Sequence, residues 1–68
     1  MQTFKQDIIV TIDDKRKSLR MRKEHLAEKS GITTMTYSRY LRGETFPALN
    51  ILQDMCDAVN LTLIAVSL

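Results

Sequence analysis

The segment Leu26–Gly43, LAEKSGITTMTYSRYLRG, carries the side chains whose types and spacing best suit molecular recognition. A short apolar helix face reaches Gly31, and a second helical stretch starts at once on hydroxyl residues. Its outward side chains are Thr33, Thr34, Met35, Ser38 and Arg39. Short hydroxyl and thioether groups let a helix approach a nucleic-acid groove closely, and an arginine can donate two hydrogen bonds to guanine. The pattern favours base-edge recognition over catalysis.

Two other reactive side chains, His25 and Cys56, stand alone in the chain. His25 falls on the outer face of a predicted helix with no second ligand or nucleophile near it, so we expect neither a metal site nor a catalytic role. Cys56 falls on an apolar helix stripe and is expected to be a small buried hydrophobe and not a reactive thiol. The sequence has no phosphate-binding glycine loop, paired-carboxylate arrangement or zinc-ligand spacing. We therefore expect no enzyme activity and no cofactor.

Positive charge is concentrated in the middle of the sequence. Residues 15–42 contain nine basic and two acidic residues, a net charge of +7, whereas the residues after Gly43 include three acidic residues and no basic one. The middle would attract a polyanion and the end would not. The alternative interpretation is an ordinary solvated helix face.

Length and composition predict one domain over residues 1–68. The 68 residues are 44% hydrophobic and 26% charged. No apolar run is long enough to span a membrane, the first ten residues do not read as a secretory signal, and a single cysteine fits a reducing compartment. These features predict a cytoplasmic protein.

The first third of the chain predicts one helix, and the segment before that helix has two possible structures. Residues 3–10, TFKQDIIV, could form a strand or the start of a helix. Thr11 is a plausible N-cap, and the acidic pair Asp13 and Asp14 would suit a helix N-terminus. The sequence thus predicts a helix from about Thr11–Ile12 to Leu19 or Arg20, with Ile12 and Leu19 on one face.

Three further helices and a strand are predicted after it. Residues 23–29 form a helix that Gly31 ends with a positive φ, with Leu26, Ala27 and Ser30 inward. Thr33 caps a helix over 34–41, and Pro47 precedes a helix over 48–59 that Asn60 ends in a left-handed conformation. The stripe of this last helix is Leu49, Leu52, Met55, Cys56 and Val59. Residues 61–68, LTLIAVSL, predict a strand.

The pair of helices over about 23–41 forms a helix-turn-helix pattern, in which the second helix lies in the major groove. At this point the sequence resembles the phage repressor and Cro type of regulators, also called XRE-like, over about Ile12 to Leu61. The resemblance is carried by Arg16, by LAEKSGI (26–32), by Gly43 and Pro47, and by ALNILQDMCDAVNL (48–61). It implies a mainly α, four-helix repressor-like domain, in a nucleoid-associated protein of bacterial or phage origin. To this the sequence adds a C-terminal β-strand, paired with an N-terminal strand or with the partner chain.

By position, the resemblance implies roles for individual residues. Base edges would be contacted by Thr33, Thr34, Met35, Ser38 and Arg39. Phosphates would be contacted by Lys23 and Arg42, and Arg20 is expected to contact a phosphate as well. Interior positions are occupied by Ala27, Ile32, Tyr37 and Tyr40.

Three residues depart from the pattern of the family. Tyr37 stands where a smaller aliphatic residue is usual, so either the helix packing is looser or its hydroxyl reaches a phosphate. Leu41 stands where a glutamate is common, and Lys15 occupies a usually apolar position. None of the three removes the outward-facing set of residue types.

The function that these features predict is sequence-specific binding of double-stranded DNA by a transcriptional regulator. We expect a repressor that binds a two-fold symmetric operator as a homodimer, because one recognition helix reads only a few base pairs. The candidate dimer element is Leu61–Leu68; alternatively this segment extends the core. Two other functions remain open: an antitoxin that represses its own operon and binds a toxin, and a protein-interaction module that does not bind DNA.

Overall fold

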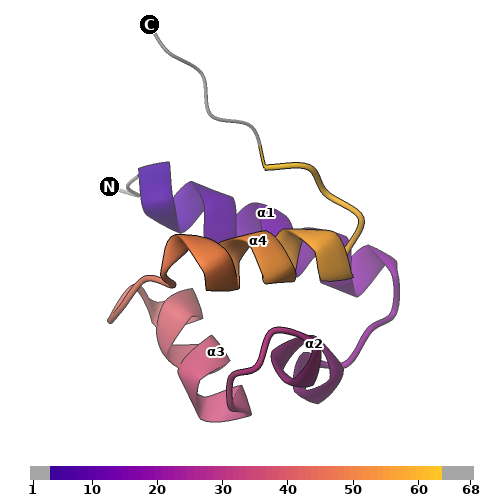
Figure 1. The fold of residues 1–68 in the computed structure, drawn as a ribbon, viewed down its shortest axis with the longest axis horizontal. Coiled ribbons are helices and arrows are strands. Elements are labelled where there is room, and N and C mark those ends of the chain that lie inside the picture. Colours follow the sequence, from indigo (N-terminus) through magenta and orange to yellow (C-terminus); the bar gives the residue numbers. More distant parts are fainter. Residues whose placement is uncertain (1–3, 64–68) are drawn as a thin grey trace, which may run out of the picture.

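The computed structural model describes the backbone of residues 4–63 and the side chains of residues 6–63. Within that range the chain forms four helices: α1 (Phe4–Ser18), α2 (Lys23–Lys29), α3 (Thr34–Arg42) and α4 (Leu49–Ala58). Figure 1 shows α4 crossing in front of α1, with α2 and α3 on the other side of α4. Contacts join α3 to both α1 and α2, and α2 to α4. The mainly α, four-helix class is therefore as predicted.

The first helix begins much earlier than the sequence predicted. It starts at Phe4, and the expected N-cap, Thr11, lies in its interior and donates its hydroxyl to the carbonyl oxygen of Asp7 across 2.9 Å. The inward stripe is Ile9, Ile12, Asp13 and Arg16, all buried. Two of these four are charged, so the apolar helical period is interrupted, and the sequence placed the start of the helix too late, at Thr11–Ile12. Asp13 and Asp14 accordingly lie in the middle of α1 and not at its N-terminus.

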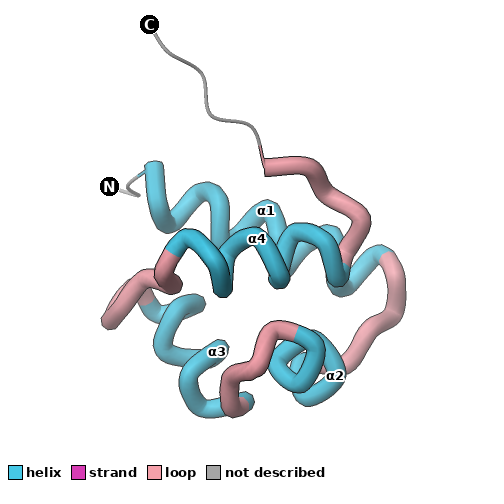
Figure 2. The backbone as a smooth tube through the Cα atoms, in the orientation of Figure 1, coloured by secondary structure: helices cyan, strands magenta, loops and turns pink. Residues whose placement is uncertain are grey.

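The predicted strands are not found in the range that the structure describes. Residues 4–10 are helical, which corrects the N-terminal strand alternative. Leu61–Leu63 form no regular element, as Figure 2 shows in pink, and residues 64–68 of the predicted C-terminal strand lie outside the described range. Leu61 and Leu63 instead pack, half-buried, against the hydrophobic core, a satisfactory use of apolar side chains that needs no strand partner.

Each of the four helices in residues 4–63 ends in the same way, with one residue in the left-handed conformation. These residues are Arg20, Gly31, Gly43 and Asn60, with φ values of 57°, 71°, 77° and 62°. At each one, its N–H and the next N–H bond back to carbonyl oxygens in the last turn, as Gly43 to Tyr40 and Glu44 to Arg39 do. This is the Schellman arrangement. It confirms the predicted ends at Gly31 and Asn60, while the cap at Arg20 was not foreseen.

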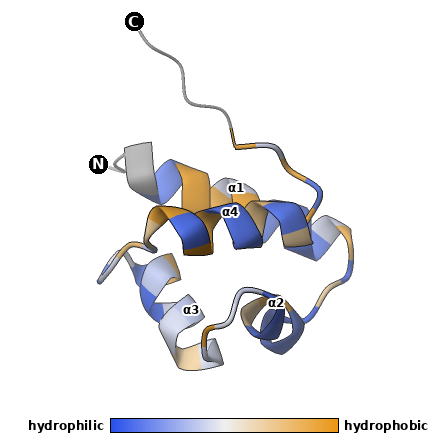
Figure 3. Cartoon of the chain, viewed as in Figure 1, coloured by the Kyte–Doolittle hydropathy of each residue, from blue (hydrophilic) through white to orange (hydrophobic). Residues whose placement is uncertain are grey.

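One hydrophobic core joins all four helices. Its largest fully buried members include Ile9, Leu26, Tyr37, Met55 and Val59. Figure 3 shows the strongly hydrophobic (orange) residues mainly on α1 and α4, where they alternate with hydrophilic ones, while α2 and α3 are mainly blue to white. Ala27 and Tyr40 are buried and Ile32 is half-buried, so the predicted interior positions of the second and third helices are confirmed.

Two leucines predicted to face the interior are exposed instead. Leu19 follows the end of α1 and is 41% exposed, because the helix does not reach it. Leu49 is the first residue of α4 and is 73% exposed, although it falls on the same stripe as Leu52. A helix stripe is buried only where another element covers it.

The contrast between Leu52 and Leu49 gives a stability test. Leu52→Ala should lower the free energy of unfolding by about 2–5 kcal/mol, because it leaves a cavity in the core beside a side chain that is 4% exposed. Leu49→Ala, the same change on the same helix, should cost less than about 0.5 kcal/mol. Urea denaturation followed by circular dichroism measures both. Equal losses would mean that α4 is packed by a different face.

Candidate nucleic-acid interface

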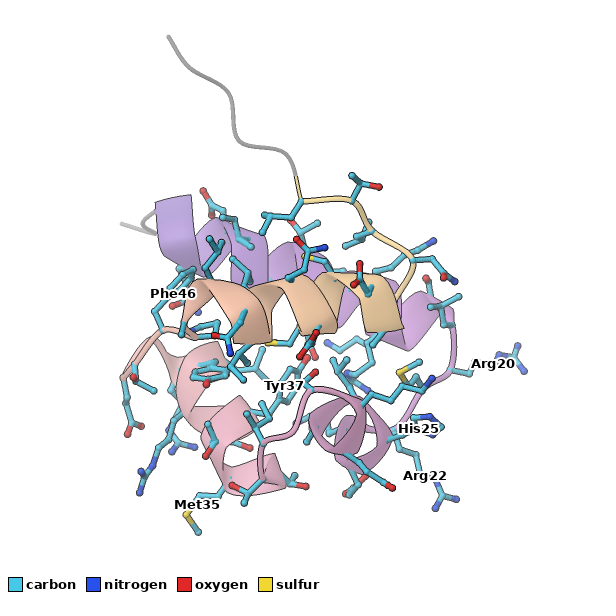
Figure 4. The ribbon with its side chains drawn as sticks, viewed as in Figure 1. Arg20, Arg22, His25, Met35, Tyr37 and Phe46 are labelled. Atoms are coloured by element: carbon cyan, nitrogen blue, oxygen red, sulfur yellow. The ribbon has the colours of Figure 1, made fainter. Side chains whose placement is uncertain are left out.

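The outward surface of α3 holds the residues that the sequence singled out for base contacts. Met35 is 65% exposed, Arg39 is exposed, and Thr34 and Ser38 are half-buried. Figure 4 shows Met35 pointing away from the body of the protein, whereas Tyr37 points inward. The structure therefore brings a thioether, two hydroxyls and a guanidinium together on one helix, a set able to offer both hydrogen bonds and apolar contact.

Thr33 lies at the edge of this set, and its hydroxyl already has a structural task. It accepts a hydrogen bond from the backbone N–H of Thr36 at 3.1 Å and donates to the Thr36 hydroxyl at 3.0 Å. This is an N-cap, which satisfies an otherwise free donor in the first turn of α3. The predicted cap is confirmed. The Thr33 hydroxyl is thus committed to the helix, and the Thr33 methyl group is the part left for another contact.

Basic side chains border the surface of α3 at both ends of the helix pair. Arg20 and Lys23, the first near the start of α2 and the second its first residue, are exposed. Arg42, at the end of α3, is also exposed and forms an ion pair with Glu44. This pair lowers the pKa of the Glu44 carboxyl. An exposed ion pair contributes little to stability, so Arg42 can exchange its partner for a phosphate at small cost.

One basic residue near the surface was missed at the sequence level. Arg22 is the N-cap residue of α2, is exposed, and makes no side-chain cap hydrogen bond. Figure 4 shows it pointing away from the body on the same lower side as Met35. Its position directly before the first turn of a predicted helix, two residues after Arg20, could have indicated a further phosphate contact.

Behind the outward surface of α3 lies a buried polar network that joins three elements. Asp13 Oδ1 accepts hydrogen bonds from the Tyr37 hydroxyl at 2.6 Å and from Arg16 Nε at 2.9 Å. Arg16 Nη1 donates to the carbonyl oxygen of Met21 at 2.7 Å, and Lys17 Nζ lies 3.4 Å from Asp13 Oδ2. One carboxylate on α1 thereby holds α3 directly and, through Arg16, the turn that leads into α2.

The network also sets the ionisation of its members. Burial raises the pKa of Asp13, but the hydrogen bonds from Tyr37 and Arg16 outweigh it, and the net pKa is below the ordinary value of 3.8. Burial, followed by the bond to the Asp13 carboxylate, raises the pKa of Tyr37. Asp13 is thus ionised and Tyr37 neutral at pH 7, which is the state in which the hydroxyl donates.

This arrangement corrects one expectation for Tyr37. Its side chain is fully buried and its hydroxyl bonds to Asp13, so it does not reach a phosphate, and the packing of α2 on α3 accommodates the larger ring. The sequence did not reveal the Asp13–Tyr37 pair because the two residues are 24 positions apart. The tyrosine at a usually aliphatic position was its only signal.

An apolar groove lies on another part of the molecule. It has a volume of about 400 Å³ and runs between α1 and the segment after α4, with Ile8, Ile12, Leu61 and Leu63 in its walls. Cys56 lines it and is 4% exposed, which agrees with the predicted buried thiol. Burial, with a smaller contribution from Asp57, raises the pKa of that thiol.

The described residues hold neither a metal-binding cluster nor a membrane-spanning helix. Within residues 4–63, no cluster of three His, Cys, Asp or Glu side chains could hold a metal ion. No helix in the described part of the chain is both long and apolar enough to cross a membrane.

Comparison with known proteins gives one match. A protein-family model described as helix-turn-helix, of the Cro/XRE kind, matches residues 12–65. Neither a curated protein nor a solved structure matches the chain. The matched residues contain α2 and α3 whole, together with the loops that border them.

The buried carboxylate predicts a change in acid stability. Because the folded-state pKa of Asp13 is lowered, its contribution to stability is complete above its ordinary pKa of 3.8 and is lost as the pH falls below that value. Asp13→Asn should lower the free energy of unfolding at pH 7 by about 1–3 kcal/mol. It should also flatten the loss of stability between about pH 5 and pH 2.

The neighbouring Asp14 is the matched control, since it is an exposed aspartate on the same helix. Asp14→Asn should change neither quantity by more than about 0.5 kcal/mol. Urea titrations at a series of pH values measure both. If the free energy of unfolding falls as steeply with acid in Asp13→Asn as in the unaltered protein, protonation of Asp13 does not cause the loss of stability.

Proposed function

Because the chain belongs to the Cro/XRE kind of helix-turn-helix family, whose members are DNA-binding transcription regulators and not enzymes, we propose that it binds a specific two-fold symmetric operator as a dimer and represses transcription there. The observation that carries the proposal is the outward surface of α3. It presents Thr34, Met35, Ser38 and Arg39 while the opposite side of the helix is fixed in the core.

The side chains on α3 differ in the base atoms that each can contact. Arg39 is the charged member of the set and suits the two acceptors of guanine, O6 and N7. Met35, whose side chain is 65% exposed, suits the methyl group of thymine. Thr34 and Ser38 can donate to or accept from several bases, so they add affinity and little discrimination. The Thr33 methyl completes the contact at the helix start.

Phosphate contacts are assigned to the basic residues that border this surface. Lys23 and Arg20 stand at the start of α2 and Arg42 at the end of α3, so that the reading helix is flanked by cations. The exposed Arg22 adds a fourth cation at the α2 end. Such contacts fix the register of the protein on the duplex and carry no sequence information.

Dimerisation is assigned to Leu61–Leu68 and to the groove beside it. Leu61 and Leu63 line the groove, and the next five residues, IAVSL, include four apolar ones. We propose that the same five residues of a second copy fill the groove between α1 and Leu63, and that a two-fold axis repeats the contact. A repressor of this design needs only to occupy its site, since a bound dimer competes directly with the transcription machinery.

The test of specificity starts with selection of bound sites from random duplex DNA. We expect a two-fold symmetric site with at least one guanine in each half. On that site Arg39→Ala should lose about 1–3 kcal/mol of binding free energy and little on random DNA. Arg39→Lys should restore affinity better than selectivity, because a lysine lacks the planar fork. Equal losses on both duplexes would make Arg39 a phosphate contact. A selected site together with a stable partner protein that copurifies from the native host would favour the antitoxin alternative.

The phosphate contacts are tested by the salt dependence of binding. Lys23→Ala or Arg42→Ala should weaken binding to specific and random duplexes alike and reduce the slope of log K against log salt by about one unit each. Lys29→Ala is the matched control, because Lys29 lies beside Asp54 and Asp57 of α4. Its slope should stay close to that of the unaltered protein. A nearly flat slope in the unaltered protein would favour the interaction-module alternative.

The dimer is tested by two truncations. Removal of residues 64–68 should give a folded monomer by sedimentation equilibrium, because Leu61 and Leu63 still cover the core. Removal of residues 61–68 should also lower stability. In the full chain, alkylation of Cys56 should slow as protein concentration rises, since a second copy covers the groove that Cys56 lines. A slow rate that does not depend on concentration would mean that the chain covers its own groove.

A further inference from the structure

Two hydrogen bonds join α1 to α3 at separate points along α3. The Tyr37 hydroxyl donates to Asp13 Oδ1 across 2.6 Å, and Gln6 Nε2 donates to the carbonyl oxygen of Leu41 across 2.8 Å. Tyr37 and Leu41 are four residues apart, about one turn of helix. A single contact would leave α3 free to pivot, whereas two contacts a turn apart constrain both its tilt and its rotation about its own axis.

Both partners of the hydrogen bond between Tyr37 and Asp13 are held in place by other contacts. The tyrosine is fully buried, and the Asp13 carboxylate that receives its hydrogen bond is also held by Arg16 at 2.9 Å. Hydrogen bonds to an ionised acceptor are short and about twice as strong as those between neutral groups. The position of the Tyr37 ring, and with it the direction of the opposite side of α3, is therefore set from α1.

The contact at Gln6 uses a group that the helix leaves free. The carbonyl oxygen of Leu41 is among the last four of α3, which have no partner inside the helix. Gly43, with φ of 77°, directly follows Arg42, the last residue of α3, and a Cβ atom on Gly43 would lie only 2.7 Å from Gln6 Oε1. Glycine thus serves the left-handed cap and also leaves room for the Gln6 side chain.

We propose that Tyr37 and Gln6 are positioning residues that set the rotation of α3 and thereby the sequence discrimination of the protein, a role that rests on the proposed function. A rotation of about 10° moves a side-chain tip about 6 Å from the helix axis by about 1 Å. A recognition site tolerates errors of only about 0.5 Å. Loss of either contact therefore misdirects Arg39 and Met35 without removing any group that touches DNA.

The test compares binding of folded variants to the selected operator and to random duplex of equal length. Tyr37→Phe should lower the ratio of specific to random affinity about tenfold, and Gln6→Ala about threefold, a smaller effect because its contact is less buried. The affinity for random duplex and the salt slope should stay unchanged. A purely structural role would not move the ratio, because a smaller folded fraction weakens binding to both duplexes equally.

Two variants serve as controls. Tyr40→Phe removes a hydroxyl from the same helix, and among the described residues no hydrogen bond joins that hydroxyl to a partner; its ratio should equal that of the unaltered protein. Asp13→Asn removes the charge and keeps an acceptor oxygen for Tyr37, so it should lose stability yet keep the ratio within about twofold.

The outcomes separate the two proposals. An unaltered protein that binds operator and random duplex equally contradicts the proposed function itself. An unaltered protein that discriminates, together with ratios within twofold of it in both Tyr37→Phe and Gln6→Ala, overturns the positioning role. Circular dichroism at 10 °C establishes folding before each titration. If Tyr37→Phe does not fold, Gln6→Ala decides, because that change leaves the buried carboxylate and its partners intact.

Discussion

The carboxylate of Asp13 is the constraint on which the arrangement of this small domain depends. Burying an ionised group is costly unless it is paired and hydrogen-bonded. Asp13 meets that condition with Arg16 beside it on α1 and Tyr37 across the core, while Arg16 also bonds to Met21 before α2. Removing any one of these partners leaves a charge partly unsatisfied, so α1, the start of α2 and α3 must keep one relative placement. Apolar packing alone would tolerate small sliding of the helices; a shared carboxylate does not.

That constraint explains how a chain of 68 residues can present a defined surface with so little core. A domain of this size buries only about 60% of the surface of its unfolded chain. The helices are short, and each of the four described ends in a left-handed cap that satisfies its last carbonyls locally. The caps make the turns compact, and the apolar core stabilises the packing of the helices. The polar network fixes how α1, the start of α2 and α3 are placed relative to one another. The outward side of α3 then presents Thr34, Met35, Ser38 and Arg39, while the Thr33 hydroxyl at its edge caps the helix.

Most of this could be predicted where the signals were local. Gly31, the Thr33 cap and Asn60 mark helix ends through their own backbone preferences, and the bounds of α2 and α3 follow from them. The signals failed where tertiary structure decides. The start of α1 was hidden because buried Asp13 and Arg16 break its apolar period, and Leu49 was misplaced because nothing covers the first turn of α4. The residue types on the candidate interface were evident from the sequence; the network behind them, which joins residues 24 positions apart, was not.

The most direct test of the account is a titration of the isotope-labelled protein with its selected duplex, followed residue by residue in two-dimensional NMR spectra. The account predicts that the largest changes fall on the backbone amides of Thr34, Ser38 and Arg39 and on the methyl group of Met35. The amides of Asp54 and Asp57 on α4 should change little, because they lie beside the control residue Lys29 and no proposed contact residue belongs to α4. Largest changes on α4 or along the groove between α1 and Leu63, with α3 unmoved, would contradict it.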